Sequence, residues 1–413
     1  MKDENVPQAK DKNSLARSRG RRQFLAASTA IAAGVAGGMT NLWGDEGRDP
    51  GAPLSPYGQR SPFEKPARRN SRPGPPGTGS SLTPLESLYG IITPSALHFE
   101  RHHSGVPTLD PDKHELLIHG MVEKPLVFRM EELQRFPSVS RIYFLECSGN
   151  SAGEYPADTA PTPQQAAGLL SCSEWTGVPL ATLLREASVK PGAKWVLAEG
   201  GDASRNARSI PLDKALDDVL VAYGQNGEAV RPEQGYPIRL IVPGWEGNIN
   251  TKWLQRLHVV DQPAMTRDEA ADYDDLLPSG KSYRFSFVME AKSIVTRPAG
   301  GQHLLGPGTY EITGLAWSGR ARIAAVEIST DAGKNWRKAE LQQPVLKNAV
   351  VRFRLPWEWD GNDAVIASRC TDESGYVQPT HEQIIAARGK NARFHYNGIK
   401  WWHLQKSGEL TNA

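Results

Sequence analysis

A lone cysteine stands where an apolar run ends and a tight turn begins. Cys147 closes the run FLEC and is followed by the turn sequence SGN. A thiol at the end of a strand, beside a glycine that lets a ligand approach the backbone, could be a metal ligand or a nucleophile. It could also fill a gap in the core, because free cysteine is among the most buried residue types. This stretch alone favours the buried interpretation.

Polar and cationic residues follow several other apolar runs in the same way. Three such loops are FERHHSGVP (99–107), AEGGDASRNARSIPL (198–212) and GYPIRLIVPGWEGNINTKW (235–253), and they carry Arg101, His103, Asp202, Ser209, Arg239, Asn250 and Lys252. Arginine and lysine bind phosphate, and a thiolate is a soft metal ligand. If these loops converge, they form a site for a phosphate-bearing cofactor with a thiophilic metal.

Other common chemistries find no support. HELLIH (114–119) lacks the H-E-x-x-H spacing of zinc peptidases and alternates like a strand. The chain has no C-x-x-C-H haem motif and no Walker loop, and its three cysteines are too few for an iron–sulfur cluster. A net charge of only +2 gives no electrostatic case for binding nucleic acid.

The N-terminal region carries an export signal. RGRRQFLA (19–26), followed by an Ala/Gly-rich run, has the features of a twin-arginine signal, which we place at residues 1–44. The run is too short and too weakly apolar for a stable membrane span, so none is expected in the mature chain. Twin-arginine export moves folded proteins, commonly after a cofactor is loaded, so the signal predicts a periplasmic protein with a cofactor.

Cysteine usage fits that prediction. Three cysteines leave at least one unpaired, and an unpaired thiol in an oxidising compartment must be buried or bound to metal. This favours Cys147 as a ligand. Cys172 and Cys370 are expected to be structural, and a disulfide between them cannot be inferred.

The remaining sequence indicates an arm and two domains. Residues 45–84 are rich in Pro, Gly, Ser and Arg, which predicts an extended linker or a surface arm. Residues 85–284 mix strands with helices such as PLATLLREAS (179–188). From 285 to 413, short alternating strands predict a β-sandwich, and we expect the aromatic tail (391–405) to pack on a domain surface.

Taken in order, the loop motifs resemble those of the sulfite oxidase family of molybdopterin enzymes. FERHHSGVP resembles F-x-R-N-H-x-P-V-P, and FLECSGN resembles L-x-C-A-G-N. QGYPIRLIVPG and INTKWLQRL resemble H-G-F-P-V-R-x-V-V-P-G and V-K-W-L. The resemblance covers residues 85–403. It implies an α+β fold, with a mixed α/β molybdopterin domain followed by an immunoglobulin-like β-sandwich that mediates dimerisation.

The resemblance also implies roles for individual residues. Cys147 would supply the single protein thiolate to a molybdenum that is also held by the pterin. The residues expected to hold the pterin and its phosphate are Arg101, His103, Asp202, Ser209, Arg239, Asn250 and Lys252. Tyr273, in AADYDDL, would lie beside the metal as a hydrogen-bond donor, and we expect Arg101, Cys147 and Tyr273 to form the catalytic group.

Three positions depart from the family pattern, and two of them bear on the substrate. Ala152 stands five residues after the cysteine, where sulfite-oxidising relatives have an arginine, and HYNGIKWW places Asn397 at a second arginine position. Gln234 replaces a histidine that contacts the pterin. Each lost charge-assisted contact is worth on the order of 1.5–3 kcal/mol, so free sulfite is expected to be a poor substrate.

The expected function is therefore oxidation of sulfane sulfur carried on a partner protein, as in the sulfane dehydrogenases of the thiosulfate-oxidising Sox system. Electrons would pass to a separate c-type cytochrome, because this chain binds no haem. The resemblance implies a homodimer through the C-terminal domain or a heterotetramer with the cytochrome. The alternatives are a sulfite dehydrogenase, a molybdenum reductase running in the opposite direction, and a binding or scaffold module without a cofactor.

Overall fold

The computed structural model describes residues 53–71, 74–157 and 159–413, so the twin-arginine segment lies outside the described residues. The chain divides into two units, Met1–Lys65 and Pro66–Ala413. The described residues of the first unit, 53–65, form no helix or strand. Among all described residues, no helix has both the length and the apolar character needed to cross a bilayer.

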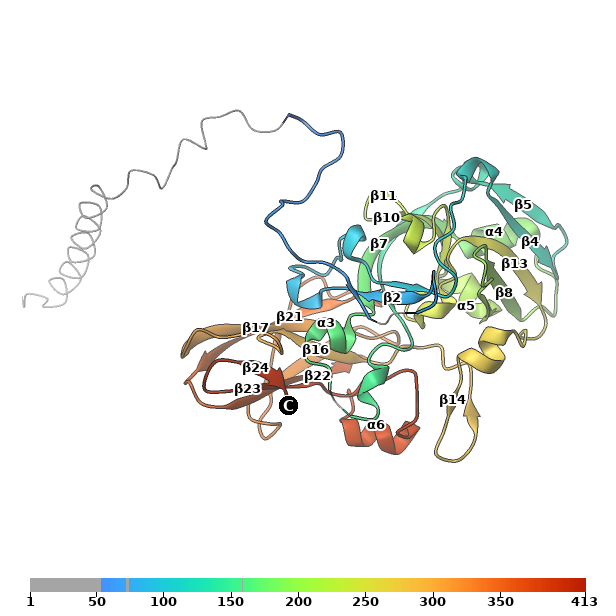
Figure 1. The fold of residues 1–413 in the computed structure, drawn as a ribbon. Helices are drawn as coiled ribbons and strands as arrows, with labels where there is room; N and C mark the ends of the chain where they lie inside the picture. Colours follow the sequence, from blue (N-terminus) through green and yellow to red (C-terminus); the bar gives the residue numbers. More distant parts are fainter. Residues whose placement is uncertain (1–52, 72–73, 158) are drawn as a thin grey trace, which may run out of the picture. The chain divides into compact units, whose positions relative to one another are not determined.

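Two five-stranded sheets form the first domain of the second unit (Figure 1). One sheet contains, in spatial order, β5 (Leu126–Arg129), β4 (Glu115–Gly120), β13 (Leu254–Val260), β8 (Trp195–Gly200) and β9 (Ala207–Pro211). The other contains β11 (Glu228–Ala229), β10 (Leu220–Gln225), β7 (Leu170–Pro179) and β6 (Val139–Glu146), with β12 (Arg239–Ile241) also paired to β10. The helices of this domain are α2 (Met130–Leu133), α3 (Pro163–Ala167), α4 (Leu180–Ala187) and α5 (Leu212–Asp217).

The helix predicted at 179–188 illustrates why these segments fold as they do. In α4, Leu180, Leu183, Leu184 and Ala187 are buried, at the i, i+3, i+4 and i+7 positions that share one face of a helix. The same core cluster contains Leu116 and Ile118 of β4, which alternate with more exposed residues. The apolar stripe of the helix and the inward face of the sheet thus form one core.

A β-sandwich forms the second domain, as predicted. One sheet contains β16 (Lys292–Arg297), β17 (Gly308–Trp317), β21 (Val351–Trp359) and β20 (Glu340–Leu341). The other contains β19 (Arg337–Lys338), β18 (Ile323–Ser329), β22 (Ala364–Asp372), β23 (Trp401–Leu404) and β24 (Leu410–Asn412). The aromatic tail does more than pack on a surface, because β23 pairs with β22 and so extends the sheet.

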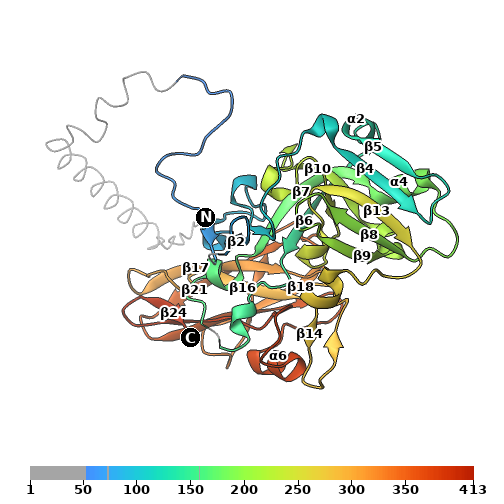
Figure 2. The same ribbon diagram turned by 45° about the vertical axis from the view of Figure 1, so that its right-hand side comes forward.

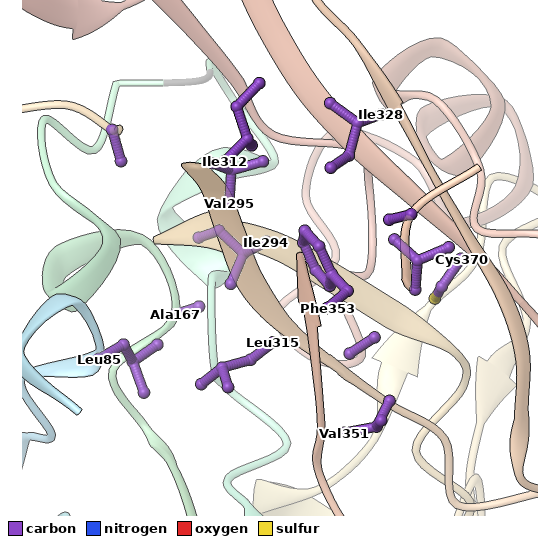
Figure 3. Close-up of a cluster of buried hydrophobic side chains, with 14 of the residues drawn as sticks. Leu85, Ala167, Ile294, Val295, Ile312, Leu315, Ile328, Val351, Phe353 and Cys370 are labelled. Atoms are coloured by element: carbon purple, nitrogen blue, oxygen red, sulfur yellow. The ribbon is translucent and has the colours of Figure 1, made fainter. Parts of the chain in front are cut away.

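The sandwich core continues into the first domain. Phe353 and Ile294 share a cluster with Leu85 and Ala167, which precede the sandwich in the chain (Figure 3). Cys172 and Cys370 are buried free thiols in this cluster, so both are structural, as expected. The two domains are therefore held together by shared apolar burial.

Part of the predicted linker belongs to the folded unit. β1 (Arg69–Asn70) and β2 (Gly79–Leu82) form a small sheet with β3 (Glu100–His102). Leu82 and Thr83 are buried. Residues 66–71 and 74–83 therefore belong to an arm fixed on the first domain, and β2 of this arm pairs directly with the RHH segment.

A hairpin and a helix lie beside each other near the predicted Tyr273. The hairpin is formed by β14 (Asp275–Leu276) and β15 (Ser282–Tyr283), and Figures 1 and 2 both show it next to α6 (His381–Arg388). Asp275 of the hairpin accepts a hydrogen bond from the backbone N–H of Arg393, at 2.8 Å. This contact ties the segment after Tyr273 to the segment after α6.

The shared core yields the first testable prediction. Phe353 is fully buried, so Phe353→Ala should lower the free energy of unfolding by about 3–5 kcal/mol. Leu305 is 97% exposed, so Leu305→Ala should change it by less than about 0.5 kcal/mol. Denaturant unfolding of both variants tests this, and equal effects would show that the Phe353 cluster does not hold the fold together.

Candidate active site

The loop after β6 holds Cys147 in a fixed turn. The backbone N–H of Asn150 donates to the carbonyl of Cys147 at 2.8 Å, and the Asn150 amide accepts from the N–H of Leu169 at 3.1 Å. A Cβ built on Gly247 would lie only 3.1 Å from the Cα of Cys147, so the neighbouring segment needs glycine there. Burial raises the pKa of the Cys147 thiol, so a metal would have to stabilise its thiolate.

The carboxylate of Glu146 anchors this turn to the sandwich. It accepts hydrogen bonds from Asn150 Nδ2 at 2.8 Å and from Trp317 Nε1 at 2.6 Å. Lys292 Nζ lies 3.5 Å from the same carboxylate and donates to Ser151 Oγ at 2.7 Å. Both ends of the CSGNS loop are thus held by residues of the second domain.

Ser151 completes the spacing G-x-S-x-G in GNSAG (149–153), which also occurs in hydrolases that use a serine nucleophile. It has a φ of 62°, in the left-handed region. Its hydroxyl donates to the carbonyl of Ala166 at 2.5 Å while accepting from Lys292. The hydroxyl proton is therefore engaged with the backbone, and Ser151 anchors the loop.

Most of the predicted site residues converge on one cavity. The predicted residues that line it are Arg101, His103, Cys147, Asp202, Arg239, Asn250, Lys252 and Tyr273. They come from the ends of β3, β6, β8 and β12, from the loop before β13 and from the residue after the π-helix η8 (Asp268–Asp272). Gln234 also lines the cavity. The convergence that sequence alone could only assume is therefore present.

Ser209 is the predicted residue that the structure does not bring to this cavity. It lies on β9 and is fully buried. Its hydroxyl accepts from the N–H of Ala264 at 3.0 Å, and its own N–H donates to Glu269 at 2.8 Å. The side chain faces the segment before Tyr273, because side chains alternate along a strand, so the sequence-based assignment of Ser209 to cofactor binding is not supported.

Two buried cations in the cavity need an anion. Arg239 has no ion pair with any carboxylate among the described residues, and its Nε has no hydrogen-bond partner there. Burial lowers its pKa to about 9. Burial, together with the charge of Arg239, lowers the pKa of Lys252 to about 7. A buried, uncompensated charge is unfavourable, so these residues fit a bound phosphate.

Further polar atoms in the wall suit a heterocyclic ligand. Within the described residues, Asp202 Oδ1, Asn248 Oδ1, Thr251 Oγ1 and His98 Nε2 are buried without a hydrogen-bond partner, and all four residues line the cavity. Native proteins leave few such atoms unsatisfied. The donors and acceptors of a pterin, with its phosphate at Arg239 and a thiophilic metal at Cys147, fit this wall.

Tyr273 and His103 form a hydrogen-bonded pair that faces Cys147. The distance from His103 Nε2 to Tyr273 Oη is 3.0 Å. Burial raises the pKa of Tyr273 and lowers that of His103, so both are neutral and the phenol keeps its proton. The guanidinium of Arg208 lies 4.9 Å from the centre of the Tyr273 ring.

A fully buried network supports Tyr273 from behind. Arg208 pairs with Glu246 at 2.9 Å and with Glu269 at 3.0 Å. Although burial favours its neutral form, the charges of Arg208 and His395 lower the pKa of Glu246 to about 2. Sequence reasoning missed this network, because no motif marks partners that lie so far apart in the chain.

A second, wider cavity of about 840 Å³ opens from Cys147, Tyr273 and Arg101 toward the surface. Ala152 lines this cavity, at the position where sulfite-oxidising relatives are expected to have an arginine. Arg69 of the arm and Arg393 also line it, and sequence reasoning missed both. Because these residues line an opening that leads to Cys147, a substrate could approach the thiol from this side.

The second predicted departure from the family pattern needs correction. Asn397 is buried and donates to the carbonyl of Ala291 and to the hydroxyl of Tyr376, both at 3.0 Å, so it does not face the wide cavity. Arg393 does. The tripeptide NAR (391–393) matches the N-L-R of the family motif better than HYN does, and this signal could have identified Arg393.

The lowered pKa of Lys252 gives a pH prediction. Between about pH 8 and 10, inorganic phosphate should bind the cofactor-free protein more weakly as pH rises. Below about pH 9 the loss is at most about tenfold per pH unit, since binding takes up one proton at Lys252, and above about pH 9 it is steeper, since Arg239 also loses its charge. The effect on folding is opposite, because the pKa of folded Lys252 lies below its unfolded value of 10.5, so the cofactor-free fold gains stability as pH rises above about 7.

Calorimetric titration with phosphate at several pH values measures this dependence. Lys252→Met should bind phosphate more weakly and keep only the part of the dependence that comes from Arg239, near and above about pH 9. Wild-type binding that is constant over this range would contradict the role given to Lys252.

Comparisons with known proteins agree with the geometry. Residues 103–267 match the family described as oxidoreductase molybdopterin binding domain, and residues 284–401 match the Mo-co oxidoreductase dimerisation domain. The chain is 31% identical over 369 residues to the mitochondrial sulfite oxidase of Drosophila melanogaster, covering 82% of this chain and 63% of that protein. It is 35% identical over 315 residues to a nitrate reductase (NADPH) of Phytophthora infestans, covering 68% and 34%. It thus spans less than two thirds of these relatives.

A solved structure covers more of the chain. The crystal structure of the sulfane dehydrogenase SoxCD from Paracoccus pantotrophus matches with a TM-score of 0.89 and 42% identity, covering 91% of this chain and 98% of the matched chain. The order of the two domains and the α+β fold are those expected from the motifs. The chain therefore belongs to the sulfite oxidase family of molybdopterin-dependent oxidoreductases.

Proposed function

We propose that this protein oxidises sulfane sulfur that a carrier protein presents on a short covalent attachment. The observation that carries the proposal is the wide cavity beside Cys147, about 840 Å³ in volume. A small dianion such as sulfite fills only a small part of that space. A sulfur atom at the end of a peptide segment would occupy it more fully, so that the partner supplies much of the binding energy.

The likeness to the solved sulfane dehydrogenase, at 42% identity, supports this proposal. Ala152 supports it as well, since this position of the cavity wall lacks the arginine expected in sulfite-oxidising relatives. When bound, the molybdenum cofactor supplies two-electron redox chemistry. The chain's own residues orient the substrate, and Tyr273 holds a proton that its oxygen can donate beside Cys147.

The proposal includes a location and partners. The twin-arginine sequence at 19–26 supports export in the folded state to the periplasm. A c-type cytochrome subunit would accept the electrons, because the chain has no haem motif of its own. The match to a dimerisation domain at 284–401 supports a homodimer or a heterotetramer with that cytochrome.

A sulfite dehydrogenase is the second candidate, and Arg393 favours it. This arginine is exposed and lines the wide cavity, so it could bind a free anion together with Arg101. A sulfite dehydrogenase needs to contact only a small free anion, whereas a sulfane dehydrogenase must also contact the carrier protein that presents the sulfur. They can be separated by comparing turnover of free sulfite with turnover of carrier-bound sulfane.

Holoenzyme from a molybdopterin-competent host should oxidise carrier-bound sulfane much faster than sulfite, with cytochrome c as acceptor. Ala152→Arg should raise kcat/KM for sulfite by about tenfold, because a charge-assisted contact is worth on the order of 1.5–3 kcal/mol. Fast sulfite turnover by the wild type, with no response to the carrier, would select the second candidate.

The role of Cys147 can be tested in the same host. Cys147→Ser replaces a soft thiolate by a poor ligand for molybdenum. We expect activity to fall by more than about a hundredfold, the upper end of what loss of a supporting residue costs a metal site. The circular dichroism spectrum should be unchanged, since Glu146 and Asn150 still hold the loop. A variant with normal molybdenum content and normal turnover would refute the assignment.

A further inference from the structure

The arm at the start of the second unit places two consecutive arginines in different surroundings. Arg68 forms an ion pair with Glu100 and donates to the carbonyl of His98 at 3.2 Å. It also lies 3.5 Å from Glu233. Arg69, the next residue, lines the wide cavity. Arg68 thus contacts the wall of the cofactor cavity from outside.

A chain of hydrogen bonds runs from Arg68 to the cofactor cavity. Glu100 accepts from His102 Nε2 at 2.8 Å, and Lys252 Nζ donates to His102 Nδ1 at 2.9 Å. Because an ammonium group can only donate, Nδ1 of the neutral His102 ring must accept from Lys252. The ring therefore carries its proton on Nε2, which donates a hydrogen bond to Glu100. The orientation of the His102 ring therefore depends on charges at both of its ends.

The arm also holds Lys252 through the backbone. β2 pairs with β3, with Ser80 opposite Arg101. The carbonyl of Arg101 accepts from Lys252 Nζ at 3.1 Å, and the carbonyl of Glu233 accepts at 3.2 Å. With His102, these acceptors use all three ammonium hydrogens, which fixes the position of the charge beside Arg239.

We propose that Arg68 is a positioning residue for the molybdenum cofactor. It compensates the charge of Glu100, so that His102 can hold Lys252 in the cavity wall. Without Arg68, Glu100 keeps only His102 and the more distant Lys252 as cationic or donor partners among the residues that the structure describes. The Glu100 carboxylate is then no longer fixed in place, so His102 and, through it, Lys252 lose their positions in the cavity wall, and the cofactor leaves more readily.

The test measures cofactor retention in the full-length holoenzyme. After dilution into cofactor-free buffer, the time courses of molybdenum content and of released pterin fluorescence give the rate of loss. Arg68→Ala should lose cofactor about fivefold faster than wild type, which corresponds to about 1 kcal/mol. Arg68→Lys should restore part of the retention, because it keeps the charge.

Arg69→Ala is the matched control, since it removes the neighbouring arginine of the same arm without touching the hydrogen-bond chain. It should lose cofactor at the wild-type rate. Glu100→Gln keeps the shape of the side chain but removes its charge, and it decides the question if Arg68→Ala does not fold. Glu100→Gln should also accelerate the loss, because the Arg68 contact is broken.

Wild-type retention in both Arg68→Ala and Glu100→Gln would overturn the proposal. Equal acceleration in Arg68→Ala and Arg69→Ala would also overturn it, since the arm would then act only through general packing. None of these readouts depends on which sulfur compound the enzyme oxidises. Failure of the proposed substrate and failure of this inference are therefore distinguishable.

Discussion

The buried carboxylate of Glu146 is the contact on which the geometry of the site depends. It precedes Cys147 directly and joins the turn, through Asn150, to the sandwich, through Trp317. A carboxylate in such a place is tolerated only when its oxygens are satisfied. The position of the Cys147 thiol is thus set by both domains, and the sandwich is a structural part of the candidate active site as well as the region that matches a dimerisation domain.

The site combines charges that are paired with charges that are not. Arg208 is fully buried, and its charge is compensated by Glu246 and Glu269 within the described part of the chain. Arg239 is equally buried, but no described carboxylate compensates it. The contrast marks Arg239 as the place where a bound anion, such as a cofactor phosphate, would remove an electrostatic cost that the described residues leave uncompensated.

Much of the fold and of the site followed from local patterns in the sequence. The alternation of apolar and polar residues identified β4, and the helical spacing of apolar residues identified α4. The family resemblance of the loop motifs predicted that Cys147, Lys252 and Tyr273 share one site. Ser209 does not line the cavity with the other predicted residues, because motif position does not say to which side a strand residue points. The role of Arg68 depends on which strands become neighbours, and Arg393 was missed because the tail was aligned on Asn397. The orientation of Ser209 and the contacts of Arg68 and Arg393 depend on tertiary structure, so no short sequence motif reveals them.

The last strands of the sandwich have a consequence for the order of assembly. β23 adds to β22, and the segment before it supplies Arg393 to the wide cavity and His395, 3.5 Å from Glu246. During synthesis, the Cys147 turn and the cations emerge from the ribosome long before these residues do. The wall of the wide cavity is therefore completed only after Arg393 has been translated, whereas every residue that lines the cofactor cavity, up to Tyr273, precedes the sandwich in the chain.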